Sequence, residues 1–374
     1  MKNLISIIVI ILVLVGGYFL LNKTENIQNI GSVKIGVLLP LSGSRADAGE
    51  LSKNATEIAK EEISGDSERK NKLEFIYEDT KYEPQTAVSA ATKLIDLDKV
   101  HYLIGPGGSS EALAVAPLVE KAKVVLIVHG AQSDEISDAG DYVFRIVHNT
   151  RQEAPIFAKF LSEGMKGSTL HFLAMNTAAI DSYLKNFTPT FEASGKKVGK
   201  VEKFDTKVID FKDMLIKLKS DNPTDIFILA VPKQTGIILK QAGELGIKAK
   251  FWGIGSEGTE ITQIGGSMAE GYTYPYSYDH TIAGERVKKF YDKYVEKFGK
   301  QPDALAANAY DAVYLLSDCL EKVGDNSEKV KQCLYSVKDF EGAGGKFSID
   351  SKGDAIKDIF VKTIKNGQFV KLEE

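Results

Sequence analysis

The sequence has very few cysteines and no excess of charge of either sign. Only two cysteines occur among its 374 residues, which excludes a disulfide-dense scaffold and a four-cysteine zinc site. The 47 basic and 51 acidic side chains give a net charge of −4, so nucleic acid is not an expected partner. Because 43% of the residues are hydrophobic, the chain is expected to form two domains with sizeable cores.

The common catalytic and nucleotide-binding motifs are also missing. No His-x-x-x-His or His-Glu-x-x-His pair occurs among the five histidines, which argues against the common zinc hydrolase sites. The sequence contains no Gly-x-x-x-x-Gly-Lys-Ser/Thr phosphate loop and no Gly-x-Ser-x-Gly nucleophile turn. It therefore predicts a protein that is not an enzyme and that binds no metal and no cofactor.

The longest apolar run lies near the N-terminus, from Leu4 to Leu21. It is longer than the apolar part of a usual secretory signal, and neither an Ala-x-Ala cleavage site nor a cysteine for lipid attachment follows it. Because about 18 apolar residues can span a bilayer, residues 1–23 are predicted to be a membrane anchor that holds residues 4–21 in the membrane. A cleaved signal peptide is the main alternative, and a buried core helix is the third. Either of the first two places the rest of the chain outside the cytoplasm, after a polar tether at residues 24–32.

Beyond the tether, short apolar strands alternate with amphipathic helices in two consecutive series. Strands are predicted at residues 33–39, 73–77, 100–104, 124–128, 142–146, 170–174, 198–204, 226–230 and 251–254, and later near Phe347, Ile359 and Phe369. Helices are predicted at residues 50–63, 84–95, 109–121, 153–163, 182–193, 211–218, 236–245, 285–298, 305–323 and 328–337. Such alternation is typical of parallel sheets with helices on both faces. The fold class is therefore α/β, with two doubly wound lobes that follow an N-terminal hydrophobic helix.

The helices and strands near the C-terminus are too few for a third domain, so they are expected to complete the two lobes. The first lobe is predicted to comprise residues 33–149 and 281–345. The second is predicted to comprise residues 150–280 and 346–374.

One glycine-rich loop leads from a strand directly into a helix, at Gly105 to Ser110. Pro106 removes a backbone donor there, and Ser110 stands where a dinucleotide-binding loop has its third glycine. What remains is a helix N-terminus with free N–H groups and the hydroxyls of Ser109 and Ser110, which together favour an anion such as a carboxylate. The alternative is that Ser109 only caps the helix.

Cys319 and Cys333 lie on successive predicted helices. In an exported chain they either form one disulfide or remain two buried thiols. Nearby, tyrosines alternate along one predicted strand, at Tyr272, Tyr274, Tyr276 and Tyr278. Their period of two is typical of a strand with one face toward a cleft or solvent, and at least two of them are expected in the core.

Several stretches resemble, in order along the chain, the branched-chain amino-acid binding proteins of the type I periplasmic-binding fold. They are Val33 to Gly43, Glu78 to Ile95, Val100 to Ser110, Asp210 to Ile228, Gly236 to Gly246 and Gly342 to Asp354. The resemblance implies two lobes joined by three crossover strands, with a small-molecule ligand between them. It also implies an extracytoplasmic receptor that delivers an amino acid or a similar small carboxylate to the permease subunits of an ABC importer. The alternative is a ligand-sensing module that signals through a partner, because related lobes serve as receptor ectodomains.

The resemblance further implies roles for single residues. Ser109 stands where the family binds the α-carboxylate of the solute. Gly130, Ala131 and Gln132 stand where backbone and hydroxyl groups contact the amino acid, with Gln132 in place of the usual hydroxyl residue. Glu257 is the nearest candidate for the acidic residue that pairs with the ammonium group.

The sequence also departs from the family pattern. Ala48, Ile180 and Val231 stand where the family has aromatic residues around its ligand. Arg45 adds a cation that the family's first loop lacks, and Ser44 beside it is a further candidate contact. A solute larger or more acidic than leucine is therefore expected.

Overall fold

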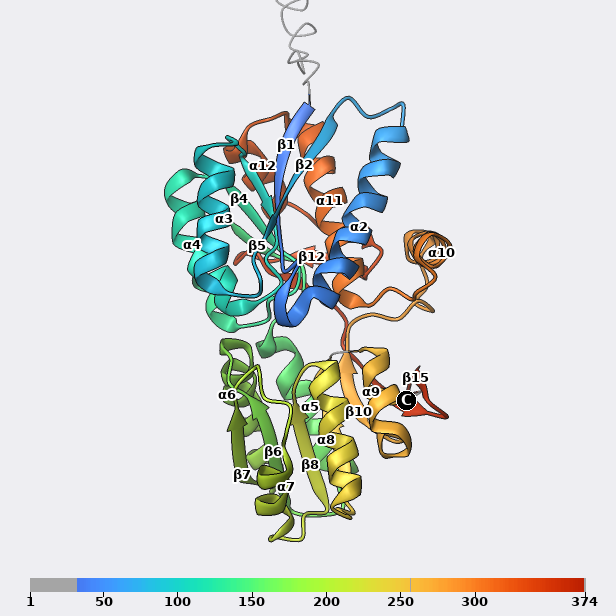
Figure 1. Ribbon diagram of the computed structural model, residues 1–374. Helices are drawn as coiled ribbons and strands as arrows, with labels where there is room; N and C mark the ends of the chain where they lie inside the picture. Colours follow the sequence, from blue (N-terminus) through green and yellow to red (C-terminus); the bar gives the residue numbers. More distant parts are fainter. Residues whose placement is uncertain (1–31, 256, 373–374) are drawn as a thin grey trace, which may run out of the picture.

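The computed structural model describes residues 32–255 and 257–372. The predicted membrane anchor, residues 1–23, and the tether before Ser32 lie outside this range. Within the described part, no helix is both long enough and apolar enough to cross a membrane. Figure 1 shows two lobes, one above the other: blue and cyan segments lie only in the upper lobe, green and yellow segments form most of the lower lobe, and orange and red segments occur in both.

The first lobe is built on a five-stranded parallel sheet with the strand order β2-β1-β3-β4-β5. Its strands are β1 (Ser32–Leu39), β2 (Lys72–Asp79), β3 (Tyr102–Ile104), β4 (Val125–Val128) and β5 (Val143–Arg145). Every residue of strands β3, β4 and β5 is buried. Such continuous burial is expected where helices cover both faces of a sheet.

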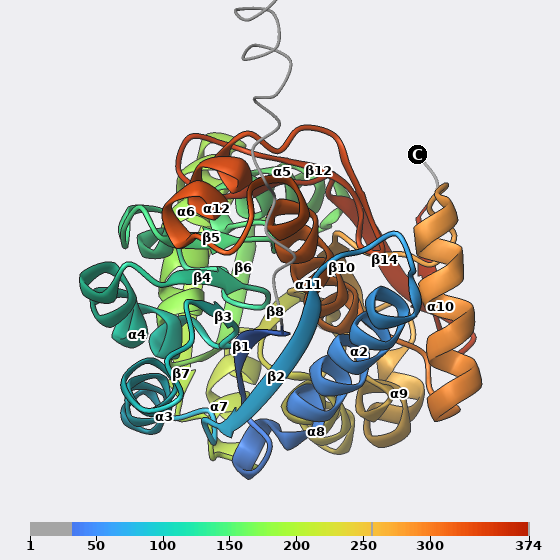
Figure 2. The ribbon, with the colours of Figure 1, turned by 90° about the horizontal axis from the view of Figure 1, so that it is seen from above.

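Helices from two distant parts of the chain cover this sheet. Those from the first series are α2 (Ala46–Gly65), α3 (Pro84–Asp96) and α4 (Ser109–Ala122), and those from the later part are α11 (Ala304–Val323) and α12 (Ser327–Tyr335). Figure 2 shows α3 and α4 on one side of the sheet, with α2 and α11 packed together on the other. The first lobe is therefore completed by residues that follow the whole second series.

The second lobe contains a seven-stranded sheet with the order β15-β14-β10-β9-β8-β6-β7. Its strands are β6 (Thr169–Met175), β7 (Lys197–Phe204), β8 (Asp225–Leu229), β9 (Lys250–Gly253), β10 (Thr273–Tyr276), β14 (Phe360–Lys365) and β15 (Gln368–Lys371). Strands β6 to β10 are parallel to one another, whereas β14 pairs antiparallel with both β10 and β15.

The helices of this lobe are α5 (Thr150–Gly164), α6 (Ala178–Ala193), α7 (Lys212–Lys219), α8 (Pro232–Glu244) and α9 (Thr259–Gly265). Aromatic rings fill the space between helix α5 and the sheet. The ring of Phe157 lies 5.7 Å from that of Phe227 and 6.2 Å from that of Trp252, both edge-on. The buried indole of Trp252 donates a hydrogen bond to Asp225, so this core leaves no polar atom of the ring unpaired.

The chain passes between the lobes three times (Figure 1). The first crossing joins β5 to α5, and the second joins β10 to α10 (Glu285–Phe298). Before the third, β11 (Phe340–Gly342), β12 (Gly345–Ile349) and β13 (Ala355–Ile356) form a small antiparallel sheet. Asp354 bridges to Arg145 of β5, so the small sheet lies against the first lobe and the chain reaches the second sheet only at β14.

Most predicted strands and helices are present, with ends shifted by a few residues. Helix α5 begins at Thr150 rather than at residue 153, because the side chain of Asn149 accepts the N–H of Gln152 and caps the helix three residues earlier. Helix α9 was not predicted. Cys319 and Cys333 form a disulfide, which settles the choice between a disulfide and two thiols.

Candidate functional site

A cavity of about 150 Å³ lies between the two lobes. Its walls come from loops that follow the carboxyl ends of parallel strands in both sheets, where open α/β sheets bind ligands. The first lobe contributes Pro40 after β1, Ser109 after β3 and Gly130 after β4, and the second contributes Met175, Ala230 and Ile254 at the ends of β6, β8 and β9. The cavity therefore requires both lobes.

Ser109, the first residue of helix α4, lines one side of the cavity. Ser109 is not the residue that caps this helix, because Gly108 occupies the cap position. Its hydroxyl accepts the backbone N–H of Ser133 at 3.1 Å. Since a hydroxyl donates once and accepts twice, the proton of Ser109 remains available to a ligand oxygen at the positive end of the helix dipole.

Glycine is needed at the neighbouring positions for steric reasons. A Cβ atom on Gly130 would lie 2.9 Å from the carbonyl oxygen of Gly107 and 2.5 Å from Cδ1 of Leu305. The loops after β3 and β4 therefore approach each other and the start of α11 more closely than a side chain would allow. This approach brings the backbone of Gly107 and Gly130 to the cavity wall.

Two histidines line the same cavity, both embedded in hydrogen bonds. His129 Nε2 lies 3.0 Å from the hydroxyl of Ser52, and its Nδ1 has no partner in the described part of the chain. Burial lowers the pKa of His129 to about 4, so its ring is neutral near pH 7. Nε2 of His148 contacts both the amide of Gln132, at 2.7 Å, and the buried carboxylate of Glu153, while its Nδ1 lies 3.0 Å from the hydroxyl of Ser277.

Arg45 supplies a positive charge to the first-lobe wall. Its guanidinium lies over the ring of Tyr82, 5.7 Å from the centroid, which is a cation–π distance. Nε of Arg45 is buried and has no hydrogen-bond partner among the described residues. The nearest anion is the exposed carboxylate of Asp47 at 3.8 Å, so the guanidinium of Arg45 can still form an ion pair with an acidic group of a ligand.

Glu257 reaches the cavity from the loop after β9 and is one of two carboxylates that share a single ammonium group. Its carboxylate contacts Nζ of Lys362 at 2.7 Å and accepts the hydroxyl of Tyr274 at 2.5 Å. Lys362 also contacts Asp279 at 3.1 Å. Burial raises the pKa of Glu257 in spite of Lys362.

Asp303, just before α11, is the other carboxylate in the cavity wall. It caps α11 by accepting the N–H of Ala306 at 2.9 Å. Burial raises its pKa to about 6, and the nearby charge of Glu257 adds to the shift. The adjacent N–H of Ala304 donates to the hydroxyl of Tyr276 at 3.0 Å, which joins the start of α11 to strand β10 of the second lobe.

The structure brings together five of the eight ligand-contact residues named from the sequence. Ser109, Gly130, Gln132, Glu257 and Arg45 all line the central cavity. Ser110 lines a neighbouring cavity of about 200 Å³ that shares Tyr82, Ser109, Thr177 and Ala179 with the first. Ala131 is buried and Ser44 is exposed, and neither is in the wall of either cavity.

The three positions that depart from the family pattern, Ala48, Ile180 and Val231, all line the central cavity. Sequence reasoning did not select Tyr82, His148, Asp303 or Asn308, which line it as well. Of these, only His148 carried a usable signal, since it follows a predicted strand in the same way as the residues that were selected.

Two α/β lobes with a cavity between them, at the carboxyl ends of both sheets, are the architecture of a solute-binding protein. The family of periplasmic binding proteins matches residues 32–368, and the chain belongs to this family.

Three similar proteins span nearly the same length. A leucine-, isoleucine-, valine-, threonine- and alanine-binding protein of Pseudomonas aeruginosa is 27% identical over 86% of this chain and 87% of its own. The crystal structure of a leucine-binding protein from Thermotoga maritima has a TM-score of 0.85 and 29% identity, covering 91% of this chain and 98% of the other. A solute-binding protein of an ABC transporter from Rhodopseudomonas palustris, in complex with 3,4-dihydroxybenzoic acid, has a TM-score of 0.83 and 25% identity over 92% and 97%.

Proposed function

We propose that this protein captures an amino acid or a similar small carboxylate between its lobes and delivers it to the permease subunits of an ABC importer. The observation that carries the proposal is the free hydroxyl proton of Ser109 at the N-terminus of α4, inside a cavity that needs both lobes. A carboxylate accepts from this hydroxyl and from the first N–H groups of the helix together. The named ligands of the similar proteins, leucine and a dihydroxybenzoate, both carry a carboxylate.

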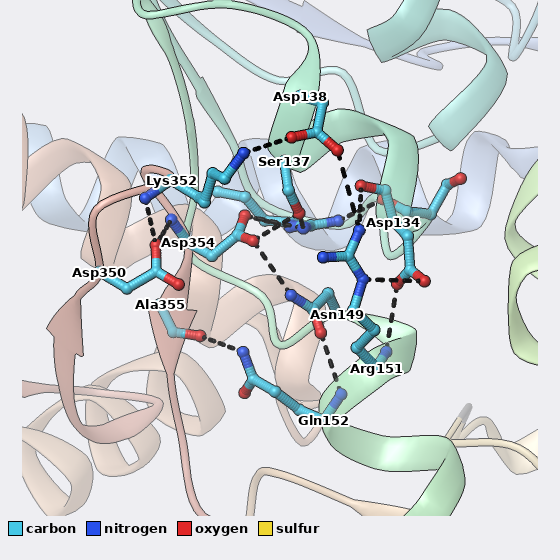
Figure 3. Close-up of polar contacts among 12 residues, drawn as sticks. Asp134, Ser137, Asp138, Asn149, Arg151, Gln152, Asp350, Lys352, Asp354 and Ala355 are labelled. Atoms are coloured by element: carbon cyan, nitrogen blue, oxygen red, sulfur yellow. Dashed lines mark hydrogen bonds and ion pairs between the residues drawn. The ribbon is translucent and has the colours of Figure 1, made fainter. Parts of the chain in front are cut away.

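Capture follows from rotation of the lobes about the three crossings. We place these crossings at residues 146–149, 277–284 and 357–359, between the elements of the two lobes. Rotation there opens the cavity to solvent and closes it over the solute, while each sheet keeps its own packing. Figure 3 shows Asp354, from the segment before β13, held by Ser137 and Asn149 beside the first crossing. The first and third crossings are therefore fixed to each other and move as one hinge.

We also propose that the lobes work outside the cytoplasm and are held to the membrane through residues 4–21. The disulfide between Cys319 and Cys333 supports an oxidising compartment. Membrane tethering keeps the receptor close to a permease.

The test is a thermal-melting screen of the purified full chain against amino acids, aliphatic acids and hydroxybenzoates. A ligand that binds only the folded form raises the melting temperature, by mass action. We expect at least one small carboxylate to do so and its amide to fail. A shift by neutral sugars alone would contradict the proposal. Delivery is tested separately, by recovery of permease subunits with the receptor from cross-linked membranes in the presence of the ligand.

A further inference from the structure

Arg45 is the only arginine or lysine among the described residues of the central cavity wall. It follows strand β1, whereas Ser109 follows β3, the strand that pairs beside β1 in the first sheet. The two side chains that can bind an anion therefore lie on loops of neighbouring strands.

The guanidinium of Arg45 has little to neutralise it within the protein. Its Nε is buried and has no hydrogen-bond partner among the described residues. The carboxylate of Asp47 lies 3.8 Å from Nε, which is too far for a hydrogen bond, and its exposure to solvent makes the ion pair weak. A buried donor without an acceptor is costly, most of all when it carries a charge. An anionic group in the cavity would remove this cost.

The ring of Tyr82 holds Arg45 away from Ser109. The guanidinium lies over the face of this ring, 5.7 Å from the centroid. The edge of the same ring meets the start of α4, since a Cβ atom on Gly108 would lie 2.7 Å from Cε2 of Tyr82. Because the ring keeps the two anion-binding groups apart, a solute that uses both of them needs two acid groups.

Two carboxylates in the same wall, Glu257 and Asp303, act against a bound anion. They come from the loop after β9 and from the start of α11, and not from the loop that carries Arg45. Glu257 contacts Nζ of Lys362 at 2.7 Å. The charge of Arg45 lowers the pKa of Asp303, which burial raises to about 6, but no ion pair joins these two residues in the described part of the chain. Asp303 therefore leaves the guanidinium open to a contact with the solute.

We propose that Arg45 binds a second acid group of the solute, so that the solute class is small dicarboxylates, with one carboxylate at Ser109 and the other at Arg45. This inference rests on the proposed function, which supplies the contact at Ser109. A solute with a single carboxylate fills the first position and leaves Arg45 without a partner. A diacid satisfies both, whatever other groups its carbon chain carries.

The test compares diacids with their mono-amides, which have nearly the same shape and one charge fewer. The probes are butanedioate, pentanedioate and hexanedioate, each with its mono-amide, and glutamate with glutamine. Arg45→Met removes the charge and keeps an unbranched side chain beside Tyr82, whereas Arg45→Lys keeps the charge and loses the planar fork of donors.

The matched control is Lys53→Met, which removes one positive charge outside the site. Lys53 is exposed on α2, the helix that begins directly after Arg45, and is in the wall of neither cavity. Its ammonium group also lies over a phenol ring, 5.3 Å from the centroid of Tyr77. The control therefore separates a contact with the solute from the effect of net charge.

By calorimetry at about 0.15 M salt, where distant charges are screened, we expect wild type to bind at least one diacid about tenfold or more tighter than its mono-amide. Arg45→Met should reduce this ratio to within about threefold, and Arg45→Lys should retain part of it. Lys53→Met should retain the whole ratio. Thermal melting without ligand shows whether each variant is folded.

The inference is overturned, and the proposed function stands, if wild type binds diacids no tighter than mono-amides or if the thermal screen finds monocarboxylates alone. An unchanged ratio in Arg45→Met also overturns it, and a lower melting temperature in that case would show that Arg45 only packs on Tyr82. An equal loss of the ratio in Lys53→Met would assign the preference to net charge and overturn the contact. Binding of none of the probes, together with no hit in the thermal screen, would count against the proposed function itself.

Discussion

The guanidinium of Arg145 and the carboxylate of Asp354 form an ion pair, at 2.7 Å, between residues 209 positions apart in the chain. Both side chains are almost completely buried. Arg145 also donates to the carbonyl oxygen of Ser133. Asp354 accepts from Ser137 and Asn149 (Figure 3). The pair therefore joins the end of β5, the cap of α5 and the start of β13, at the point where two crossings meet.

Asp354→Asn should destabilise the protein strongly. The substitution leaves the buried charge of Arg145 without an opposite charge, and breaking a buried pair in this way costs about 3–5 kcal/mol. Urea unfolding, followed by circular dichroism, measures the loss. Lys352→Ala is the control, because Lys352 pairs with Asp138 on the surface of the same segment, and its unfolding midpoint should stay near that of wild type. Equal midpoints for Asp354→Asn and wild type would show that the pair does not hold the crossings together.

Ser109→Ala should weaken binding of a carboxylate about 10- to 100-fold, because a charge-assisted hydrogen bond is lost. The variant should also unfold more easily, by about 1–3 kcal/mol, since the buried N–H of Ser133 loses its acceptor. Calorimetry and chemical denaturation measure the two effects separately. Ser110→Ala, at an exposed position outside the central cavity, should bind within about threefold of wild type. A loss of stability in Ser109→Ala without a loss of affinity would remove Ser109 from the binding site.

Ala48→Tyr should narrow the range of solutes. Ala48 is buried in the wall of a cavity of about 150 Å³, and a phenol ring there occupies space that the wild type leaves to the ligand. We expect the affinity for ligands of leucine size or larger to fall at least about tenfold, with a smaller change for alanine. The same titrations across a series of side-chain sizes measure this. A uniform loss across the series would instead indicate a folding defect.

Binding of an amino acid should weaken as the pH falls through about 6. Burial raises the pKa of Asp303 to about 6 in the empty cavity, so below this pH the carboxyl is protonated and cannot pair with an ammonium group. Above it, the charged form is present and affinity reaches its plateau. The groups that act on Asp303 or are acted on by it are Arg45, Glu257, Tyr276, Tyr278 and Tyr294.

Of these groups, the tyrosines stay neutral between pH 5 and 8, because burial raises the pKa of all three. Glu257 is the one confounding group, since its pKa is also raised. Calorimetry from pH 5 to pH 8 in the Glu257→Gln background therefore isolates Asp303. If the affinity in that background does not change with pH, Asp303 does not pair with the ammonium group of an amino acid.

The fold was largely predictable because most strands are short apolar runs and most helices have an apolar face. Helix α9 escaped prediction for a physical reason. It is only seven residues long, it is flanked by Gly258 and Gly266, and it buries few side chains. A helix is recognised in a sequence by the regular spacing of the apolar residues that it buries. Because α9 buries so few, its sequence lacks that spacing.

The site residues that could be predicted from the sequence are those that follow a predicted strand within a few residues. Arg45, Ser109 and Gly130 follow the ends of strands β1, β3 and β4, and parallel strands bring their carboxyl ends to one edge. Asp303 lies there only because the chain returns to the first lobe after β10 and packs the first turn of α11 against Gly130. The ion pair between Glu257 and Lys362, 105 positions apart, likewise depends on β14 pairing beside β10.

The late position of β14 has a consequence for biosynthesis. Strand β10 pairs with β9 on one side and with β14 on the other, and the ribosome makes β14 some eighty residues after β10. Until then, β10 is an open edge with unpaired backbone groups, the kind of edge that pairs with other chains and aggregates. The second lobe therefore completes its sheet only after residue 371 has been translated. A nascent chain halted before Phe360 exposes the unpaired edge of β10 and is prone to aggregate.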